Sequence, residues 1–152
     1  MPGGERMILE RLCEMELAYR GPFELVKPYG GEEGSGYGEG EGTVTGERMA
    51  GQVRWVNHPR RRSDGRMLPD AGGIVQTDDG ARVMFRMQGR TVFGTNPQGE
   101  RKGGQLLWIL FESDDERYLW LNDAVCVIEG VIDAQTMRIK FNVYACVNEL
   151  IA

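Results

Sequence analysis

The stretch Met137–Val147, MRIKFNVYACV, alternates apolar and polar side chains over its whole length. A repeat of two residues is that of a β-strand and not of a helix. The stretch therefore predicts one wall of an antiparallel barrel, and Ala124–Val131 before it alternates in the same way. We expect the apolar members to face the inside of the barrel, namely Met137, Ile139, Phe141, Val143, Ala145 and Val147.

Further alternating segments precede this wall and are separated by turn signals. Leu12–Arg20 alternates apolar with polar residues, as expected of a strand with one face in water. Met49–Val56 also places its apolar residues on one face. Gly72–Gln76 and Arg82–Gly89 flank the tetrad Thr77-Asp78-Asp79-Gly80, and Asp-Gly between two such runs is a strong hairpin signal.

Two segments depart from this simple alternation. Gly30–Gly46, GGEEGSGYGEGEGTVTG, is so rich in glycine and glutamate that we expect a flexible loop over residues 30–42, which becomes a strand near Thr43. Gln105–Phe111 is nearly all apolar. That pattern predicts a strand that is buried on both faces or lines a cavity.

Together these segments predict an all-β chain of about seven to nine short strands with no long helix. Closing the sheet would remove its exposed edges, so we expect a single antiparallel up-and-down β-barrel of about eight strands over residues 1–152. Eight strands enclose a space that side chains fill or that holds one small ligand. The fold class therefore predicts a small-molecule cavity.

Composition excludes several classes of function. The chain has 18 Lys and Arg and 23 Asp and Glu, a net charge of −5, so no nucleic-acid partner is expected. It has neither an apolar run of membrane-spanning length nor a signal peptide, which predicts a cytoplasmic protein without a membrane partner. Its single histidine, His58, and three cysteines without CxxC spacing predict no metal site. The glycine-rich segment does not fit a phosphate-binding loop, so no cofactor is expected.

The order of motifs resembles an uncharacterised bacterial family of unknown function, family 3237, whose members are similar to calycin-like and allene-oxide-cyclase-type β-barrels. The motifs are the Gly-rich segment, the strand that contains Trp55, Asp64-Gly65, Thr77–Ala81 and the element Tyr118–Asn122. The resemblance implies a small-molecule cavity at one barrel mouth, in a wider superfamily that includes cyclases working largely by shaping a reactive substrate. The family has an acidic residue before the tryptophan where this chain has Arg54, so no role of that carboxylate is carried over.

Three polar residues are candidates for catalysis: Asp79, Arg86 and Asn122. An aspartate beside an apolar wall would have a raised pKa and serve as general acid or base, although Asp79 also suits a turn. Asn122 follows an aromatic cluster and would polarise a carbonyl or instead hold a turn. Arg86 either meets a ligand inside the barrel or lies in water.

Aromatic residues are more numerous than a small, tightly filled barrel needs, which favours a pocket over a packed core. Arg54 extends the only basic run, His58–Arg62, which would attract an anionic group or form a solvated loop. The candidate substrate-binding residues are therefore Trp55, Phe85, Trp108, Tyr118, Trp120 and Arg54.

Three functions remain open on this evidence. The first is a cofactor-free isomerase, cyclase or lyase that acts on a hydrophobic, oxygenated small molecule. The second is a non-catalytic carrier or sensor of such a molecule. The third is a filled barrel that forms a homo-oligomer or binds a partner. A titratable side chain with a perturbed pKa inside a cavity would favour the first function over the second.

Overall fold

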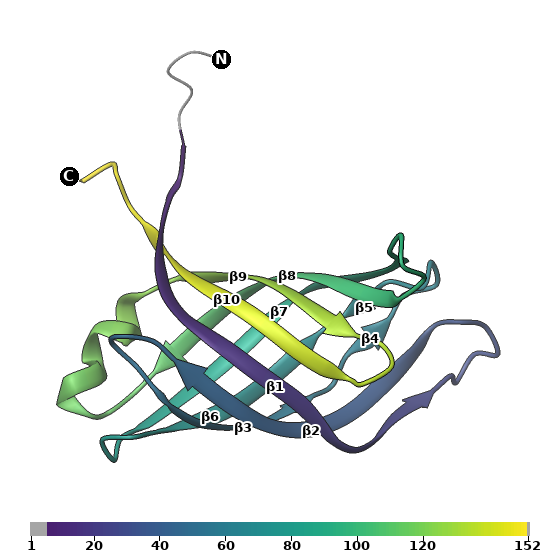
Figure 1. Ribbon diagram of the computed structural model, residues 1–152, viewed down its shortest axis with the longest axis horizontal. Helices are drawn as coiled ribbons and strands as arrows, with labels where there is room; N and C mark the ends of the chain where they lie inside the picture. Colours follow the sequence, from purple (N-terminus) through teal and green to yellow (C-terminus); the bar gives the residue numbers. More distant parts are fainter. Residues whose placement is uncertain (1–5, 152) are drawn as a thin grey trace.

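Eight long antiparallel strands close into a barrel in the computed structural model, which describes residues 6–151 (Figure 1). Neighbours around the barrel run in the order β1-β10-β9-β8-β7-β6-β3-β2, and β2 pairs back with β1. The predicted all-β barrel is confirmed. The strands are β1 Ile8–Val26, β2 Gly34–Thr45, β3 Gly51–Asn57, β6 Asp70–Thr77, β7 Arg82–Thr95, β8 Arg101–Glu112, β9 Cys126–Asp133 and β10 Arg138–Val147.

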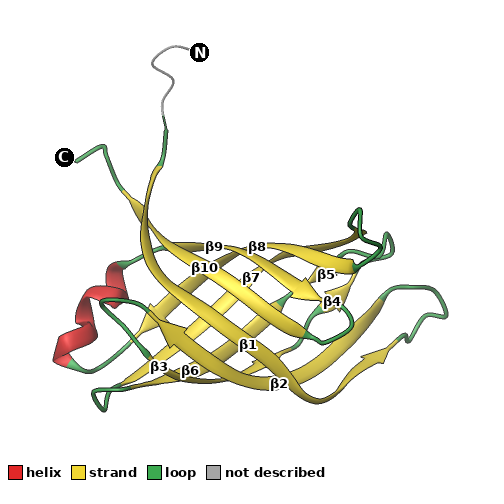
Figure 2. Cartoon of the chain, in the orientation of Figure 1, coloured by secondary structure: helices red, strands yellow, loops and turns green. Residues whose placement is uncertain are grey.

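Shorter elements differ between the two ends of the barrel (Figure 2). At one end β4, Arg60–Arg61, and β5, Met67–Leu68, pair with each other and join the edges of β2 and β7. At the other end lies the 3₁₀ helix η1, Glu116–Asp123. No helix within residues 6–151 is long and apolar enough to cross a membrane.

The interior follows the alternation predicted from the sequence. In β10, Ile139, Phe141 and Val143 are buried, whereas Arg138 and Lys140 on the opposite face are exposed. Neighbouring strands contribute their own inward residues at each level, so the core is continuous around the barrel. Its largest fully buried side chains include Phe111, Phe141, Met15, Met49, Ile109, Leu121 and Ile128.

The loop prediction for residues 30–42 was wrong over most of its length, because residues from Gly34 onward form the regular strand β2. Its glycines alternate with larger residues, and Gly36, Gly38 and Gly40 face inward against aromatic rings. A Cβ atom on Gly40 would lie 2.5 Å from Cζ2 of Trp55. The glycines of β2 therefore make room for bulky side chains from the neighbouring strands.

Of the two expectations for this strand, burial on both faces was wrong, because β8 is buried on one face only; the other, that it lines a cavity, fits its residue Gln105. Gln105, Leu107, Ile109 and Phe111 point inward, while Leu106, Trp108 and Leu110 are exposed on the outside. Apolar composition alone does not separate these faces; closure of the barrel does. The same strand therefore supplies a core row and an apolar outer row.

The 3₁₀ helix η1 covers one end of the barrel. Its Leu121 is completely buried and its Tyr118 is 5% exposed. Asp115 begins the helix by accepting a hydrogen bond from the backbone N–H of Arg117 at 2.9 Å, as an N-cap does. The guanidinium of Arg48 lies 3.5 Å above the ring of Trp120, a cation–π contact that holds the exposed side of the helix. This end is therefore closed.

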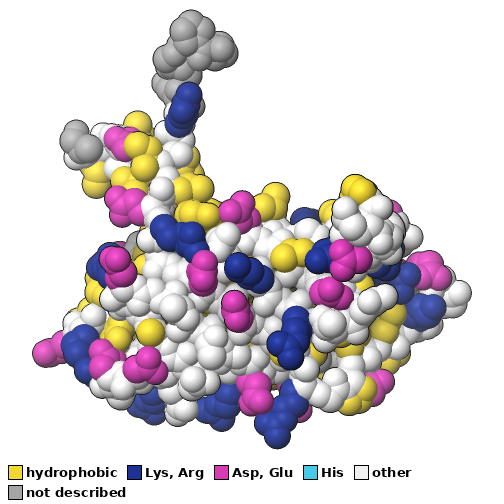
Figure 3. Space-filling view, in the orientation of Figure 1, with side chains coloured by type: hydrophobic (Ala, Val, Ile, Leu, Met, Phe, Trp, Pro, Cys, Tyr) yellow, Lys and Arg dark blue, Asp and Glu magenta, His cyan; other side chains and the backbone are white. Residues whose placement is uncertain are grey.

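The outer face formed by β1, β2 and β10 carries interspersed charges of both signs (Figure 3). Its ion pairs include Arg11 with Glu14 at 2.5 Å and Arg20 with Glu41 at 3.5 Å, all on exposed side chains. Pairs of this kind contribute little to stability. They show instead that the polar rows of these strands lie in water.

Candidate functional site

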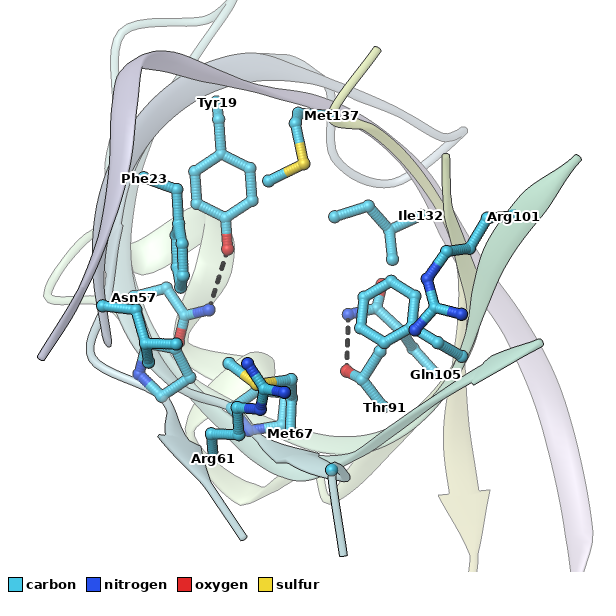
Figure 4. Close-up of a pocket in the computed structure, with 15 residues that line it drawn as sticks. Tyr19, Phe23, Asn57, Arg61, Met67, Thr91, Arg101, Gln105, Ile132 and Met137 are labelled. Carbon is cyan, nitrogen blue, oxygen red and sulfur yellow. Dashed lines mark hydrogen bonds between the residues drawn. The ribbon is translucent and has the colours of Figure 1, made fainter. Parts of the chain in front are cut away.

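A cavity of about 320 Å³ opens at the end of the barrel opposite η1 (Figure 4). Its volume lies at the lower end of the range for small-molecule sites. Apolar side chains form most of its wall, and a few polar groups interrupt them. The lining residues are Tyr19, Phe23, Leu25, Asn57, Pro59, Arg61, Gly65, Met67, Pro69, Thr91, Phe93, Arg101, Gln105, Ile132 and Met137.

One side of the cavity is an aromatic wall built on β1 and β3. Tyr19 contacts Phe23 and Trp55 edge to face, with ring centroids 5.6 Å and 4.6 Å apart. Edge-to-face pairs at these separations are favourable beyond their buried area. The inward glycines of β2 lie directly behind these rings, so the backbone of β2 supports the aromatic wall on its outer side.

A hydrogen-bonded pair, Tyr19 and Asn57, lies in this wall (Figure 4). Asn57 is 8% exposed and its Nδ2 donates to the phenolic oxygen of Tyr19 at 2.9 Å. The Oδ1 of Asn57 accepts from the backbone N–H of Asp70 at 3.1 Å, which fixes the orientation of the amide. The phenolic oxygen is thus an acceptor in this pair, and its own proton is left for another acceptor.

Burial raises the pKa of Tyr19 above its ordinary value of 10.0, and the hydrogen bond from Asn57 offsets part of that rise. A raised phenol pKa keeps the hydroxyl neutral at physiological pH. Tyr19 therefore acts as a hydrogen-bond donor to whatever oxygen atom approaches it in the cavity.

A second polar pair, Thr91 and Gln105, lies across the cavity on β7 and β8 (Figure 4). Both are buried, at 3% and 8% exposure, and Nε2 of Gln105 donates to Oγ1 of Thr91 at 3.0 Å. The buried Oε1 of Gln105 has no hydrogen-bond partner within residues 6–151. Unpaired buried polar atoms are rare and costly, so this oxygen is an acceptor available to a ligand.

Two arginines line the cavity mouth. Arg61 on β4 forms an ion pair with Glu32, whereas Arg101 at the start of β8 lies 5.1 Å from the ring centroid of Phe93. Among the described residues the lining contains no acidic side chain and no histidine. The mouth is therefore locally basic although the chain as a whole is acidic.

The three predicted catalytic residues do not line this cavity, which corrects the prediction that they act inside the barrel. Arg86 lies on the outer face of β7, 75% exposed and 3.9 Å from Asp70. It occupies an even-numbered position of that strand, where side chains point outward. Asn122 holds a turn at the closed end, accepting from the N–H of Ser113 at 2.7 Å and donating to its carbonyl at 3.0 Å.

Asp79 also lies at the closed end, in the predicted β6–β7 turn. It accepts hydrogen bonds from the hydroxyls of Thr77 at 2.5 Å and Tyr118 at 2.8 Å, and Arg117 lies 3.4 Å away. The two hydroxyls, with a smaller contribution from Arg117, lower the pKa of Asp79 below 3.8. This is opposite to the raised pKa that a general acid or base hypothesis requires. Asp79 ties η1 to the turn.

The predicted substrate-binding residues are distributed over three places. Trp55 and Phe85 are buried inside the barrel, and Trp55 supports the aromatic wall through Tyr19. Tyr118 and Trp120 belong to η1 at the closed end. Trp108 and Arg54 point outward and do not line this cavity, which corrects that part of the prediction; Trp108 borders an open hollow on the outside of the barrel instead. Of the six, the structure brings only Trp55 close to the cavity wall.

Sequence reasoning missed the polar groups of the cavity, which are Tyr19, Asn57, Thr91 and Gln105. Tyr19 and Gln105 were both recognisable as inward members of alternating strands, because they share faces with Leu17 and Leu107. Their level along the barrel depends on the stagger between strands, and no local pattern encodes that stagger. The available sequence signal for a cavity residue was a polar side chain within an otherwise apolar inward row.

Exposed apolar side chains also gather on the outer face of β7 and β8, where Met84, Leu106, Trp108 and Leu110 are 38–70% exposed. Contiguous apolar patches on a protein surface often mark interaction sites. The homo-oligomer stays a prediction, and a measurement of the mass in solution tests it.

Within residues 6–151, no three His, Cys, Asp or Glu side chains gather where they could hold a metal ion.

Residues 30–146 match the family described as a protein of unknown function, DUF3237. The chain belongs to this family. That membership confirms the resemblance that the motifs indicated, and it covers the strands from β2 to nearly the end of β10. No curated protein matches the chain.

Solved structures share the barrel at low sequence identity. A β-barrel-like protein from Acinetobacter baumannii is 16% identical with a TM-score of 0.82, covering 97% of this chain and 100% of that one. A conserved protein of unknown function from Rhodopseudomonas palustris is 17% identical with a TM-score of 0.81, covering 95% and 100%. An enzyme from Penicillium herquei is 20% identical with a TM-score of 0.69, covering 95% and 99%. At these identities the likeness concerns the fold alone.

Proposed function

We propose that this member of DUF3237 binds a small, mostly apolar, oxygenated molecule in the barrel cavity and acts on it without a cofactor, as an isomerase, cyclase or lyase. The observation that carries the proposal is the Tyr19–Asn57 pair, in which the phenol faces the cavity with its proton free. A cavity whose wall is apolar with a few convergent polar groups is typical of such sites.

The chemistry available to Tyr19 is stabilisation of negative charge on a ligand oxygen. Isomerisation, cyclisation and elimination next to a carbonyl all develop charge on that oxygen in the transition state. A fixed, neutral donor in a partly water-excluded site lowers the energy of this state more than that of the ground state. Asn57 holds the phenol in place, so little reorganisation is needed during the reaction.

The aromatic wall would contribute by holding the ligand in a reactive conformation. Tyr19 and Phe23 form a rigid surface that Trp55 supports from behind Tyr19, and Met67 and Met137 offer adaptable contacts at the rim. Orienting a substrate in this way removes part of the entropic cost of reaching the transition state. Cyclases that work mainly by shaping a reactive substrate rely on this effect.

A non-catalytic carrier or sensor is the second candidate. It is favoured by the absence of carboxylates and histidines from the cavity lining in the described part of the chain, since these are the usual proton acceptors. The third function, a filled barrel, is not favoured, because the interior is packed at the η1 end but hollow at the other end.

The experiment is a comparison of binding with turnover. Ligands that copurify are identified by native mass spectrometry, and compounds that raise the melting temperature are incubated with the protein and followed by NMR. Tyr19→Phe should still bind the ligand but lose most of its turnover, and Tyr29→Phe, an exposed control, should retain it. Binding without any chemical change in the wild-type protein would select the carrier, and absence of binding would reject both functions.

A further inference from the structure

The unpaired oxygen of Gln105 specifies a hydrogen-bond donor on the ligand. The side chain is 8% exposed, lines the cavity, and is held by its Nε2 on Thr91 Oγ1 at 3.0 Å. Because that contact fixes the amide, Oε1 stays in the cavity wall without a partner among residues 6–151. A buried acceptor of this kind favours a ligand O–H or N–H over a ligand oxygen that can only accept.

A cation lies on the same side of the cavity. Arg101 and Gln105 lie on the same side of the cavity wall (Figure 4) and both belong to β8, four residues apart. The guanidinium of Arg101 lies over the ring of Phe93. In the described part of the chain no carboxylate pairs with Arg101, whereas Arg61 across the mouth is engaged by Glu32. A guanidinium fork at the rim of an apolar cavity suits a carboxylate, which it binds through two hydrogen bonds.

Gln105 lies deeper in the cavity than Arg101, and this difference sets the orientation of a bound ligand. Gln105 is buried in the wall and Arg101 is exposed at the mouth. Successive inward positions of a strand are about 7 Å apart, so two such steps separate these residues by roughly 13 Å along β8, less the reach of both side chains. A ligand core of a single ring, or of two or three fused rings, spans the distance that remains between the two side chains and fits a cavity of about 320 Å³.

We propose that the cavity is specific for a hydroxylated carboxylic acid with a flat apolar body, whose hydroxyl donates to Gln105 Oε1 and whose carboxylate binds Arg101. This inference rests on the proposed small-molecule site and adds its ligand class. The aromatic wall packs against the body of the ligand, and Tyr19 remains free to donate to a further oxygen on it.

The test uses matched probes and matched variants. A hydroxynaphthoic acid is compared with its methyl ester, which lacks the charge, its methyl ether, which lacks the donor, and the parent naphthoic acid. Parallel sets on benzene and anthracene cores cover the size range. Affinities are measured by calorimetry on the full-length protein and on Arg101→Gln, Gln105→Met and the control Arg90→Gln, whose side chain is exposed on β7.

The acid with a free hydroxyl should bind the wild-type protein most tightly. Loss of the carboxylate or of Arg101 should weaken binding roughly tenfold to a hundredfold, as loss of a charged hydrogen bond does. Methyl esters should bind Arg101→Gln and wild type equally, and ethers should bind Gln105→Met and wild type equally. Arg90→Gln should leave every affinity unchanged.

Three results would overturn the inference. Equal binding of acids and esters by the wild-type protein removes the role of Arg101, and equal binding of phenols and ethers removes that of Gln105. Either result leaves the proposed small-molecule site intact. If no probe of any core size binds, the ligand class fails, and the search for copurified and stabilising ligands described above decides separately whether the small-molecule site stands. The wild-type comparisons stand even if Gln105→Met fails to fold.

Discussion

Tyr19 and Asn57 meet across strand β2, although they belong to β1 and β3, which do not pair with each other. Tyr19 lies opposite Gly40 and Asn57 opposite Gly38 in the register of the sheet. With no side chains on these glycines, the phenol and the amide approach over the bare backbone to 2.9 Å. The glycine row therefore creates the polar contact on which the proposed site depends.

The first prediction concerns the ionisation of Tyr19. Burial raises its pKa and the hydrogen bond from Asn57 lowers it, so Asn57→Leu should raise the pKa further. The phenol signal of Tyr19, labelled with ¹³C and assigned through Tyr19→Phe, is followed by NMR as pH increases. In the wild-type protein it should titrate above pH 10. If the phenol of Tyr19 titrated at a lower pH in Asn57→Leu than in the wild-type protein, the hydrogen bond from Asn57 to the phenolic oxygen would be contradicted.

Much of the barrel was predictable because alternation is a local property. The stretch Met137–Val147 forms β10 from Arg138 onward with the expected inward face, and Thr77–Gly80 forms the β6–β7 turn. The glycine-rich segment was missed because its composition resembles that of a flexible linker. Its alternation of Gly with Tyr37, Glu39 and Glu41 was the evidence of a strand with one bare face.

The second prediction tests that bare face. Gly40→Ala would place a methyl group against the carbonyl oxygen of Ala18 and 2.5 Å from Cζ2 of Trp55. We expect a loss of about 1–3 kcal/mol in the free energy of unfolding, as for other overpacked sites. Urea denaturation measures it. Gly104→Ala, on the outer face of β8 with its nearest contact at 3.9 Å, is the matched control and should change stability little.

The third prediction concerns the closed end of the barrel. Leu121 of η1 is completely buried, so Leu121→Ala should cost about 2–5 kcal/mol in the free energy of unfolding. Leu119→Ala, in the same helix at 46% exposure, should cost much less. Equal effects of the two substitutions in urea denaturation would show that η1 does not plug the barrel.

The site was harder to predict than the fold because it depends on the relative level of residues on separate strands. The nearly all-apolar run Gln105–Phe111 carries no alternation that would show that Leu106, Trp108 and Leu110 face water. Nor does it state which end of the barrel is open. Asp79 and Asn122 were therefore assigned to a cavity, while hydrogen bonds place them at the end that η1 closes.

The fourth prediction concerns the three thiols, Cys13, Cys126 and Cys146. Burial raises the pKa of Cys13 to about 12 and that of Cys126 to about 11, so neither forms a thiolate readily in the folded protein. Cys146 is only half-buried. A colorimetric thiol reagent at pH 8 should therefore modify one cysteine quickly and the other two only after unfolding. Cys146→Ser should abolish the fast phase, and its persistence in that variant would contradict the burial pattern.

The fifth prediction is the acid dependence of stability at the η1 end. The folded-state pKa of Asp79 is lowered below 3.8 by hydrogen bonds from Thr77 and Tyr118 and by Arg117. A lowered carboxyl pKa stabilises the fold above the unfolded value, and the contribution is lost as pH falls through the folded value. Asp79→Asn should therefore melt below wild type at pH 6, and the gap should close toward pH 2.

Asp78→Asn is the control for this effect. Asp78 is the neighbouring carboxylate in the same turn, and its side chain makes no hydrogen bond to another residue of the described chain. Its melting curve should follow that of the wild-type protein at every pH. Since Tyr118 donates directly to Asp79, Tyr118→Phe should reproduce part of the pH-dependent loss. A gap between Asp79→Asn and wild type that stays constant from pH 6 to pH 2 would mean that the aspartate acts through packing, and not through its charge.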